Sequence, residues 1–459
     1  MLTQLLPHVL AHGIGGVQDL PVPKWLFFWG GAFVLVVSFI ALGALWKTPQ
    51  LELHAGGRAL GETFGRLVLG PLRIVVQALS AFLFVVVLAA ALFGTTDPFG
   101  NFAPTWVYVI FWVGVPVLSM LLGNVWRALS PWRAIADGFV WVWERVLGRE
   151  ARPLAAYPDR LGRYPGCVTL FSFVALELCY SNPANPRVLA FAIALYSYVA
   201  LFGMLAFGRD VWVGAGEGFA ILFGYIGRMA PLVAREGRVR LRVPLTGLAG
   251  AEHTPGSVLF LAVALGSVGF DGFSRTITWQ DLVARVEAPY VLNAPGTGEL
   301  LITGLNLLGL LAAIAFVLGA FLGACWIARA MVKAPRSLAP EFVLSLVPIA
   351  LVYAIAHYFS LFVIQGQYMI PLFSDPFGKG WDLFGTAGFH PNIAILGPNT
   401  VWYVQVAALV LGHVAGLAVA HDRAVTVFRD RHDALRSQYA MLALMVLYTV
   451  GGLWLLSHK

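Results

Sequence analysis

Apolar runs recur along the whole chain at a length that suits a membrane span. A helix needs about 20 residues to cross a hydrocarbon core of roughly 30 Å. Because the runs continue from one end of the sequence to the other, the pattern predicts an all-α, polytopic transmembrane bundle of about ten spans, forming a single integral membrane domain over residues 1–459. The expected spans are 25–46, 72–94, 104–123, 164–181, 188–207, 254–271, 300–330, 341–370, 399–420 and 438–456.

A further apolar stretch, 211–234, contains Glu217 and Arg228. Charged side chains are costly at membrane depth. We therefore expect this stretch to be a re-entrant or interfacial element. If it crossed the membrane, the topology of every later span would invert.

The distribution of basic residues gives an independent test of this count. With ten spans, about 23 of the 30 Lys and Arg fall in alternate loops, and about six lie on the opposite face. The positive-inside rule then places the arginine-rich loops in the cytoplasm. Both termini are expected outside.

Three loop regions are long enough to carry structure of their own. We expect interfacial cytoplasmic segments near 124–163, where an amphipathic helix is predicted, and near 208–252. Within the second segment, Arg alternates with Val and Leu over 235–252, which predicts a short hairpin. The outer loop near 371–398 is rich in aromatic residues, Gly and Pro, as lid-like elements are.

Composition supports a membrane protein and argues against a soluble one. Hydrophobic residues make up 59% of the chain and charged residues 12%, about half the share of a typical soluble protein. The basic residues behind the net charge of +7 lie in loops beside lipid. The lipid bilayer is therefore the expected partner, and binding of nucleic acid is not expected. Cys167, Cys179 and Cys325 lie far apart in apolar runs and are expected to be small core residues.

Three polar residues near the outer ends of spans are candidate catalytic residues. Glu177, Asp271 and Gln405 lie in the fourth, sixth and ninth runs. Together they suggest an outward-opening polar cavity that holds a cation or activates a water molecule. The structural alternatives are a helix cap for Asp271 and a helix–helix hydrogen bond for Gln405.

Five histidines are candidate metal ligands. His357 and His413 lie near the middle of consecutive antiparallel spans, where they could share a metal, relay a proton or ligate haem b. A hydrogen-bonded structural role is the alternative for both. His8 and His12 are spaced i, i+4, and His390 lies in the outer loop. Zinc, copper and manganese are the candidate divalent metals for such a site.

Several short segments resemble bacterial integral membrane proteins known as fenitrothion hydrolases. The resemblance implies hydrolysis of organophosphate triesters in a bacterial cytoplasmic membrane, and its segments include Asp271, Gln405 and His413. The matching segments are HGIGG at 12–16, DLPVP at 19–23, GNVWR at 123–127, PWR at 131–133, FDGFS at 270–274, SDPFG at 374–378, WDL at 381–383, WYVQV at 402–406, GHVAG at 412–416 and HDRA at 421–424.

Two classes of function follow as hypotheses. The first is an outward-facing, metal-assisted hydrolase, whose cation would be held by Asp271, Glu177, His390 and His12. The second is non-enzymatic, either a transporter of metal or small solutes or a membrane subunit of a redox complex. A partner membrane subunit or a homo-oligomer is an expected assembly in either case.

Overall fold

The computed structural model describes residues 24–291 and 294–457, and almost all of its regular structure is helical. Within these residues, nine helices, some built from consecutive shorter elements, are long and apolar enough to cross a membrane. They confirm the predicted polytopic bundle. The spans are α2 (Lys24–Leu45), α4–η1–α5 (Glu62–Phe93), α6–η2–α7 (Phe102–Leu122), α11 (Pro186–Phe207), α14 (Ser257–Ser274), α16 (Pro295–Met331), α17–η5–α18–η6–α19 (Ala339–Ser374), α20 (Pro398–Val427) and α21–α22 (Arg431–Ser457).

The predicted fourth span corresponds to α10 (Tyr164–Cys179), which has only 16 residues and is not among these nine. Each of the ten predicted runs therefore coincides with a helix. The separate elements of the longer spans are α4 (Glu62–Leu67), η1 (Val68–Leu72), α5 (Arg73–Phe93), α6 (Phe102–Thr105), η2 (Trp106–Gly114), α7 (Val115–Leu122), α17 (Ala339–Phe342), η5 (Val343–Ser345), α18 (Leu346–Gln365), η6 (Gly366–Tyr368), α19 (Met369–Ser374), α21 (Arg431–Arg436) and α22 (Tyr439–Ser457).

The stretch at 211–234 does not form a span. It breaks after α12 (Arg209–Ala215), resumes as α13 (Gly218–Gly227) and then enters a strand. Nearly all of α13 is buried, and it packs against α7 and α10. With ten residues, α13 is too short to cross the hydrocarbon core, and its assignment as a re-entrant or interfacial element remains a prediction.

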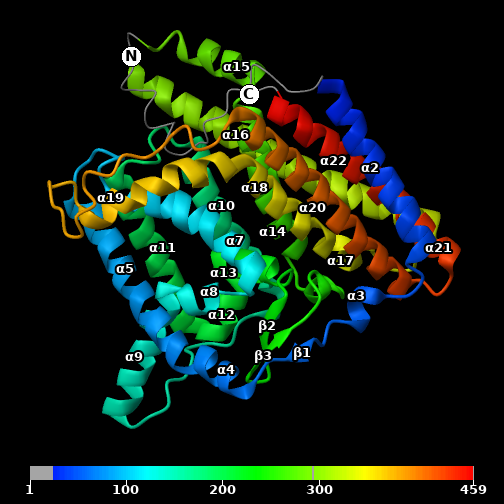
Figure 1. Ribbon diagram of the computed structural model, residues 1–459, viewed down its shortest axis with the longest axis horizontal. Helices are drawn as coiled ribbons and strands as arrows, with labels where there is room; N and C mark the ends of the chain where they lie inside the picture. The colour runs from blue at the N-terminus through cyan, green and yellow to red at the C-terminus, as the bar shows by residue number, and fades with distance from the viewer. Residues whose placement is uncertain (1–23, 292–293, 458–459) are drawn as a thin grey trace.

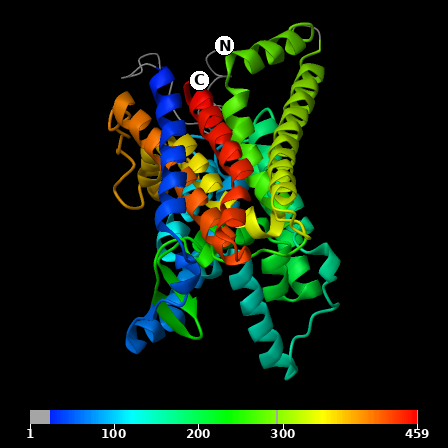
Figure 2. The same cartoon turned by 90° about the vertical axis from the view of Figure 1, so that its right-hand side faces the viewer.

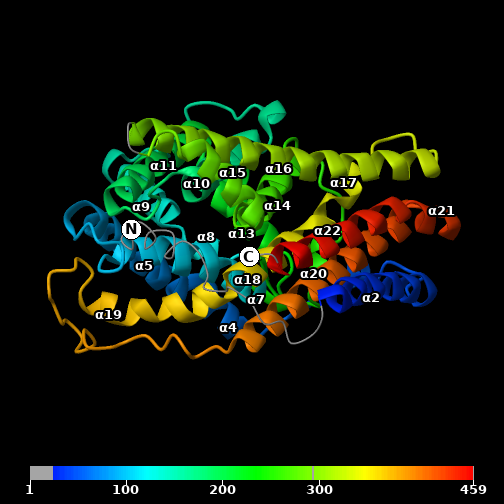
Figure 3. The ribbon, with the colours of Figure 1, turned by 90° about the horizontal axis from the view of Figure 1, so that it is seen from above.

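The centre of the bundle is formed by α14 and α18. In Figure 1 both lie within a ring of other helices, and seen from above α14 lies between α16 and α18 (Figure 3). Outer helices such as α2, α5 and α11 instead expose large apolar side chains, including Phe33, Phe82 and Phe191. Exposed aromatic and aliphatic side chains on this scale are expected where a helix faces lipid.

The described ends of the chain lie at one end of the bundle, and the arginine-rich elements lie at the other (Figure 2). The latter include α9 (Pro131–Leu147), whose first turn is buried while Phe139 and Trp143 are exposed. This helix confirms the one predicted within 124–163. The remaining short helices are α3 (Gln50–Leu53), α8 (Trp126–Leu129), η3 (Asp159–Leu161), η4 (Thr246–Leu248) and α15 (Ile277–Glu287).

A small antiparallel sheet lies at the arginine-rich end. Strands β2 (Leu232–Arg235) and β3 (Arg238–Leu241) form a hairpin, and β1 (Arg58–Ala59) pairs with β3 on its other side. Glu236 and Gly237, the two turn residues, both have positive φ, as a type I′ turn requires. The hairpin predicted for 235–252 therefore exists but begins three residues earlier, at Leu232.

The HDR sequence at 421–423 does not end its helix, because α20 continues to Val427. His421 is buried and lies 3.0 Å from Gln438 Oε1 and 3.1 Å from the Trp46 carbonyl oxygen. Asp422 accepts hydrogen bonds from Trp46 Nε1 and the Leu51 amide, both at 2.9 Å. His421 and Asp422 therefore form a buried polar joint between α20 and the segment that follows α2.

Candidate functional site

Four buried polar residues meet where α10, α14 and α18 pack together. Glu177 lies near the end of α10, Asp271 near the end of α14, and His357 and Tyr358 in the second half of α18. Each is at most 6% exposed. These four residues, with Arg275 just beyond α14, are called the carboxylate cluster below.

Asp271 is the centre of the carboxylate cluster. Its Oδ2 atom lies 2.7 Å from His357 Nε2 and accepts a hydrogen bond of 2.8 Å from the Tyr358 hydroxyl. Its Oδ1 atom accepts a 3.3 Å hydrogen bond from Arg275 Nε. The spacing of four residues places Asp271 and Arg275 on the same face, so the chain supplies this cation locally.

Tyr358 connects Asp271 to a second carboxylate. Its hydroxyl oxygen lies 3.2 Å from Glu177 Oε1 as well as 2.8 Å from Asp271 Oδ2. The hydroxyl has a single proton to donate. The hydroxyl can hydrogen-bond to both acids at once only when one acid is protonated and donates its proton to the hydroxyl oxygen. The geometry therefore favours holding an extra proton between Glu177 and Asp271.

A small cavity of about 20 Å³ adjoins His357 on the side of α20 and α22. Its lining includes Gly272, Tyr353 and Leu409. A cavity of this volume has room for about one water molecule. Among the described residues, the space beside the imidazole therefore suits a water molecule and is too small for a larger substrate.

The structure brings together three of the predicted site residues, Glu177, Asp271 and His357. Gln405 is buried on α20 and makes no hydrogen bond to them among the described residues. His390 is exposed in the loop after α19. His8 and His12 lie outside the described residues.

His413 is fully buried but faces a different environment from His357. Its Nδ1 atom lies 2.8 Å from the Leu409 carbonyl oxygen of its own helix, and its Nε2 atom has no partner among the described residues. A Cβ atom on Gly412 would come within 2.0 Å of Val352. The helices α18 and α20 are therefore in direct contact at this level, and ligation of a haem by His357 and His413 remains a prediction.

A divalent metal remains a prediction. Among residues 24–291 and 294–457, no group of three or more His, Cys, Asp or Glu side chains is placed to hold an ion. The two outer-loop acids stabilise turns: Asp375 accepts from the amides of Lys379, Gly380 and Trp381, and Asp382 accepts from that of Ala387. Cys167, Cys179 and Cys325 are buried and free, as predicted.

Sequence reasoning missed Tyr358 and Arg275. Tyr358 was overlooked because a tyrosine in an apolar run reads as an interfacial or packing residue. Two signals point to them in retrospect. Tyr358 directly follows a candidate histidine, and Arg275 follows a candidate aspartate at helical spacing.

A second buried carboxylate, Glu217, lies apart from the cluster, at the start of α13. It accepts hydrogen bonds from the Phe219 and Ala220 amides at 3.2 and 2.9 Å. Trp126 Nε1 donates to it at 3.0 Å and the Tyr196 hydroxyl at 2.5 Å. All four are neutral donors, and two belong to a helix N-terminus, so Glu217 is a buried N-cap.

Comparisons with protein-family models, with curated proteins and with solved structures find no match for this chain.

Proposed function

We propose that this protein is a proton-coupled membrane transporter in which Asp271 and His357 bind the coupling proton. One observation carries the proposal: two groups that exchange protons lie 2.7 Å apart, almost fully buried, on two central helices of the bundle. Ionisable residues deep in membrane proteins are expensive to keep and commonly form proton relays.

The charges around Asp271 explain why a proton bound here would change the conformation. The cluster contains two carboxylates against the Arg275 guanidinium and a histidine of variable charge. Adding or removing one proton changes the net charge of a buried region by one, which is costly at low dielectric. A conformation that relieves this cost is favoured, and this couples protonation to a movement of α14 against α18.

Tyr358 supplies the route between the two acids. Because its hydroxyl contacts both Glu177 and Asp271, a proton can pass from one carboxylate to the other by exchange through that hydroxyl. The single-water cavity beside His357 would extend the route towards α20.

Phosphotriester hydrolysis, which the family resemblance implies, is the competing proposal. A hydrolase needs an acid–base group beside a space that holds the substrate. The cavity beside His357 is about 20 Å³, and the large cavity described below is lined by no carboxylate or imidazole among the described residues. Turnover of fenitrothion by purified protein, abolished in Asp271→Asn, would favour the hydrolase and overturn the transporter.

Infrared difference spectroscopy of protein reconstituted in lipid tests the proton site directly. Stepping the pH should reveal the carbonyl stretch of a protonated carboxyl group, and this band should disappear in Asp271→Asn. Asp281→Asn, which removes an exposed carboxylate from α15, is the matched control and should leave the band unchanged.

Proteoliposomes that enclose a pH-sensitive dye test the coupling. Gradients of sugars, amino acids, inorganic anions and metal cations are applied in turn. A change in internal pH driven by one solute, present in Asp281→Asn and lost in Asp271→Asn, is expected. If no pH step alters the Asp271 carboxyl band and no solute moves protons, the proposal is wrong.

A further inference from the structure

A large apolar cavity lies between α5, α10 and α11. Its volume is about 940 Å³, at the upper end of the range for small-molecule sites. Among the described residues, its lining is aliphatic and aromatic apart from a few hydroxyl and indole groups. A ligand that fills it must therefore be apolar over most of its length.

The cavity opens towards the surrounding lipid. Leu79, Val168 and Phe191 line it and are 54%, 63% and 71% exposed. Along α5 the lining runs from Val76 to Val87, about 16 Å at the rise of a helix. That length is about half the thickness of the hydrocarbon core, which is the depth of one leaflet. A fatty acyl chain entering sideways from the bilayer fits these dimensions.

One end of the cavity reaches the arginine-rich end of the bundle. Leu129, Pro131 and Trp132 line the cavity there and directly precede Arg133. On α5, Arg73 lies one turn before Val76 and extends the same stripe of lining residues. Arg73 and Arg133 therefore lie next to residues that line this end of the cavity.

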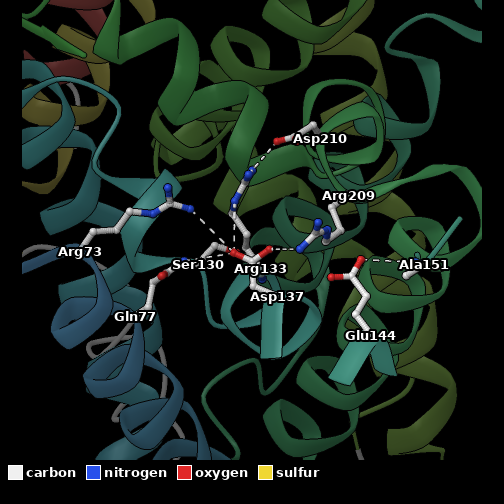
Figure 4. Close-up of polar contacts among 9 residues, drawn as sticks. All are labelled: Arg73, Gln77, Ser130, Arg133, Asp137, Glu144, Ala151, Arg209 and Asp210. Atoms are coloured by element: carbon white, nitrogen blue, oxygen red, sulfur yellow. Dashed lines mark hydrogen bonds and ion pairs between the residues drawn. The ribbon is translucent and has the colours of Figure 1, made fainter. Parts of the chain in front are cut away.

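These arginines outnumber the acids that they contact (Figure 4). Asp137 lies 2.5 Å from Arg209, 3.8 Å from Arg73 and 3.9 Å from Arg133, so three guanidinium groups share one carboxylate. Arg133 is also paired with Asp210 at 2.7 Å and is nearly buried. Arg73 and Arg209 remain 40% and 37% exposed. Both guanidinium groups contact the same carboxylate, that of Asp137, so a further anion beside it would lie near both.

We propose that the cavity binds an acyl chain of a phospholipid whose anionic headgroup is held by Arg73 and Arg209. Guanidinium groups bind phosphate through paired, charge-assisted hydrogen bonds. The weak 3.8 Å contact of Arg73 with Asp137 leaves its donors free for this role. Anionic lipids are concentrated in the leaflet that faces basic loops.

Native mass spectrometry of the full chain in mild detergent, incubated with phosphatidylglycerol or phosphatidylcholine, tests the proposal. We expect phosphatidylglycerol to be retained in preference to phosphatidylcholine. One arginine near an anionic surface contributes about 1 kcal/mol, which is about fivefold in affinity. Arg73→Gln should therefore weaken retention of phosphatidylglycerol about fivefold. Arg145→Gln, an exposed arginine on α9 that does not line the cavity, should change it little.

Ala192→Phe tests the acyl-chain site without altering charge. Ala192 lines the cavity, and a phenyl ring there would occupy the space of the chain and reduce retention of both lipids. Thermal unfolding of each variant verifies that it is folded. Equal retention of both lipids by the wild type would overturn the proposal. Equal losses in Arg73→Gln and Arg145→Gln, or a lipid-free dimer that covers the cavity, would do so as well.

Discussion

Glu217 and Asp271 are both about 1% exposed, yet the donors around them differ in kind. Glu217 is held by two backbone amides, an indole and a phenol. Asp271 is held by an imidazole, a guanidinium and a phenol that also contacts a second acid. One carboxylate is surrounded by groups that keep their protons, and the other by groups that include a proton exchanger.

The difference shows that burial alone does not mark a functional carboxylate in a membrane protein. A fixed set of neutral donors satisfies an ionised acid and makes it a structural cap. A titratable partner at 2.7 Å, as at Asp271, makes the charge of the site depend on its surroundings. A substitution at a structural cap should therefore reduce stability, and a substitution at a proton-binding acid should reduce proton movement.

Glu217→Ala should cause the largest effect, a loss of folding stability. It removes the acceptor for Trp126 and Tyr196 and the cap of α13, and each buried donor left unsatisfied costs about 1–3 kcal/mol. We expect the free energy of unfolding to fall by about 4 kcal/mol, measured by denaturant unfolding in detergent. Glu217→Gln keeps a carbonyl acceptor and should lose less than half as much. Equal losses in the two variants would contradict the N-cap interpretation.

Asp271→Asn should instead reduce proton movement strongly and folding stability little. The amide keeps the shape and one acceptor, so thermal unfolding should change little. Proton movement driven by solute should fall about 100-fold, the scale on which a positioned proton-transfer group contributes to a rate. Proteoliposome flux measures this, with Glu217→Gln as the buried control that retains flux. Loss of flux in both variants to the same degree would mean that Asp271 has no special role.

Tyr358→Phe should separate the two acids without removing either. It deletes the hydroxyl that contacts both Glu177 and Asp271 and leaves the ring in place. We expect about a tenfold loss of proton movement, which corresponds to about 1.4 kcal/mol. The infrared band of the protonated carboxyl group should also shift, because its hydrogen-bond partner is gone. An unchanged band would show that the proton does not lie between the two acids.

Most of the fold could be predicted from the sequence, because each span corresponds to a continuous apolar run that is visible in the sequence alone. All ten predicted runs coincide with helices, including the 16-residue α10. The start of the hairpin was misplaced by three residues, since the positive-φ pair Glu236–Gly237 that sets its turn is not visible in an alternation of Arg with Val and Leu.

The site was only partly predictable, because it depends on which helix faces which. Depth in the membrane can be estimated from position along a run, and this identified Glu177, Asp271 and His357. Their pairing across α10, α14 and α18 depends on helix rotation, which one sequence does not specify. His413, predicted on the same grounds as His357, lies one turn from Leu409 and bonds to its own helix.

Glu252 is a third kind of buried acid, and its substitution is expected to have the smallest effect on stability. It lies in the loop before α14, 3.2 Å from Arg163 and 3.3 Å from Arg228. Burial alone would raise the pKa of Glu252, but the Thr254 hydroxyl and both guanidinium groups outweigh burial and lower it. Because the folded pKa lies below the unfolded one, this stabilisation is complete above the unfolded pKa and is lost as the pH falls through the folded value.

Glu252→Gln should therefore reduce stability by about 1 kcal/mol at neutral pH, and the difference from wild type should vanish in acid. Thermal unfolding across this pH range measures both. Since the paired arginines keep their charge throughout, the pH dependence belongs to the glutamate. Solute-driven proton movement should stay at the wild-type level, in contrast to Asp271→Asn. A Glu252→Gln variant that lost proton movement would instead extend the proton route to the arginine-rich end of the bundle.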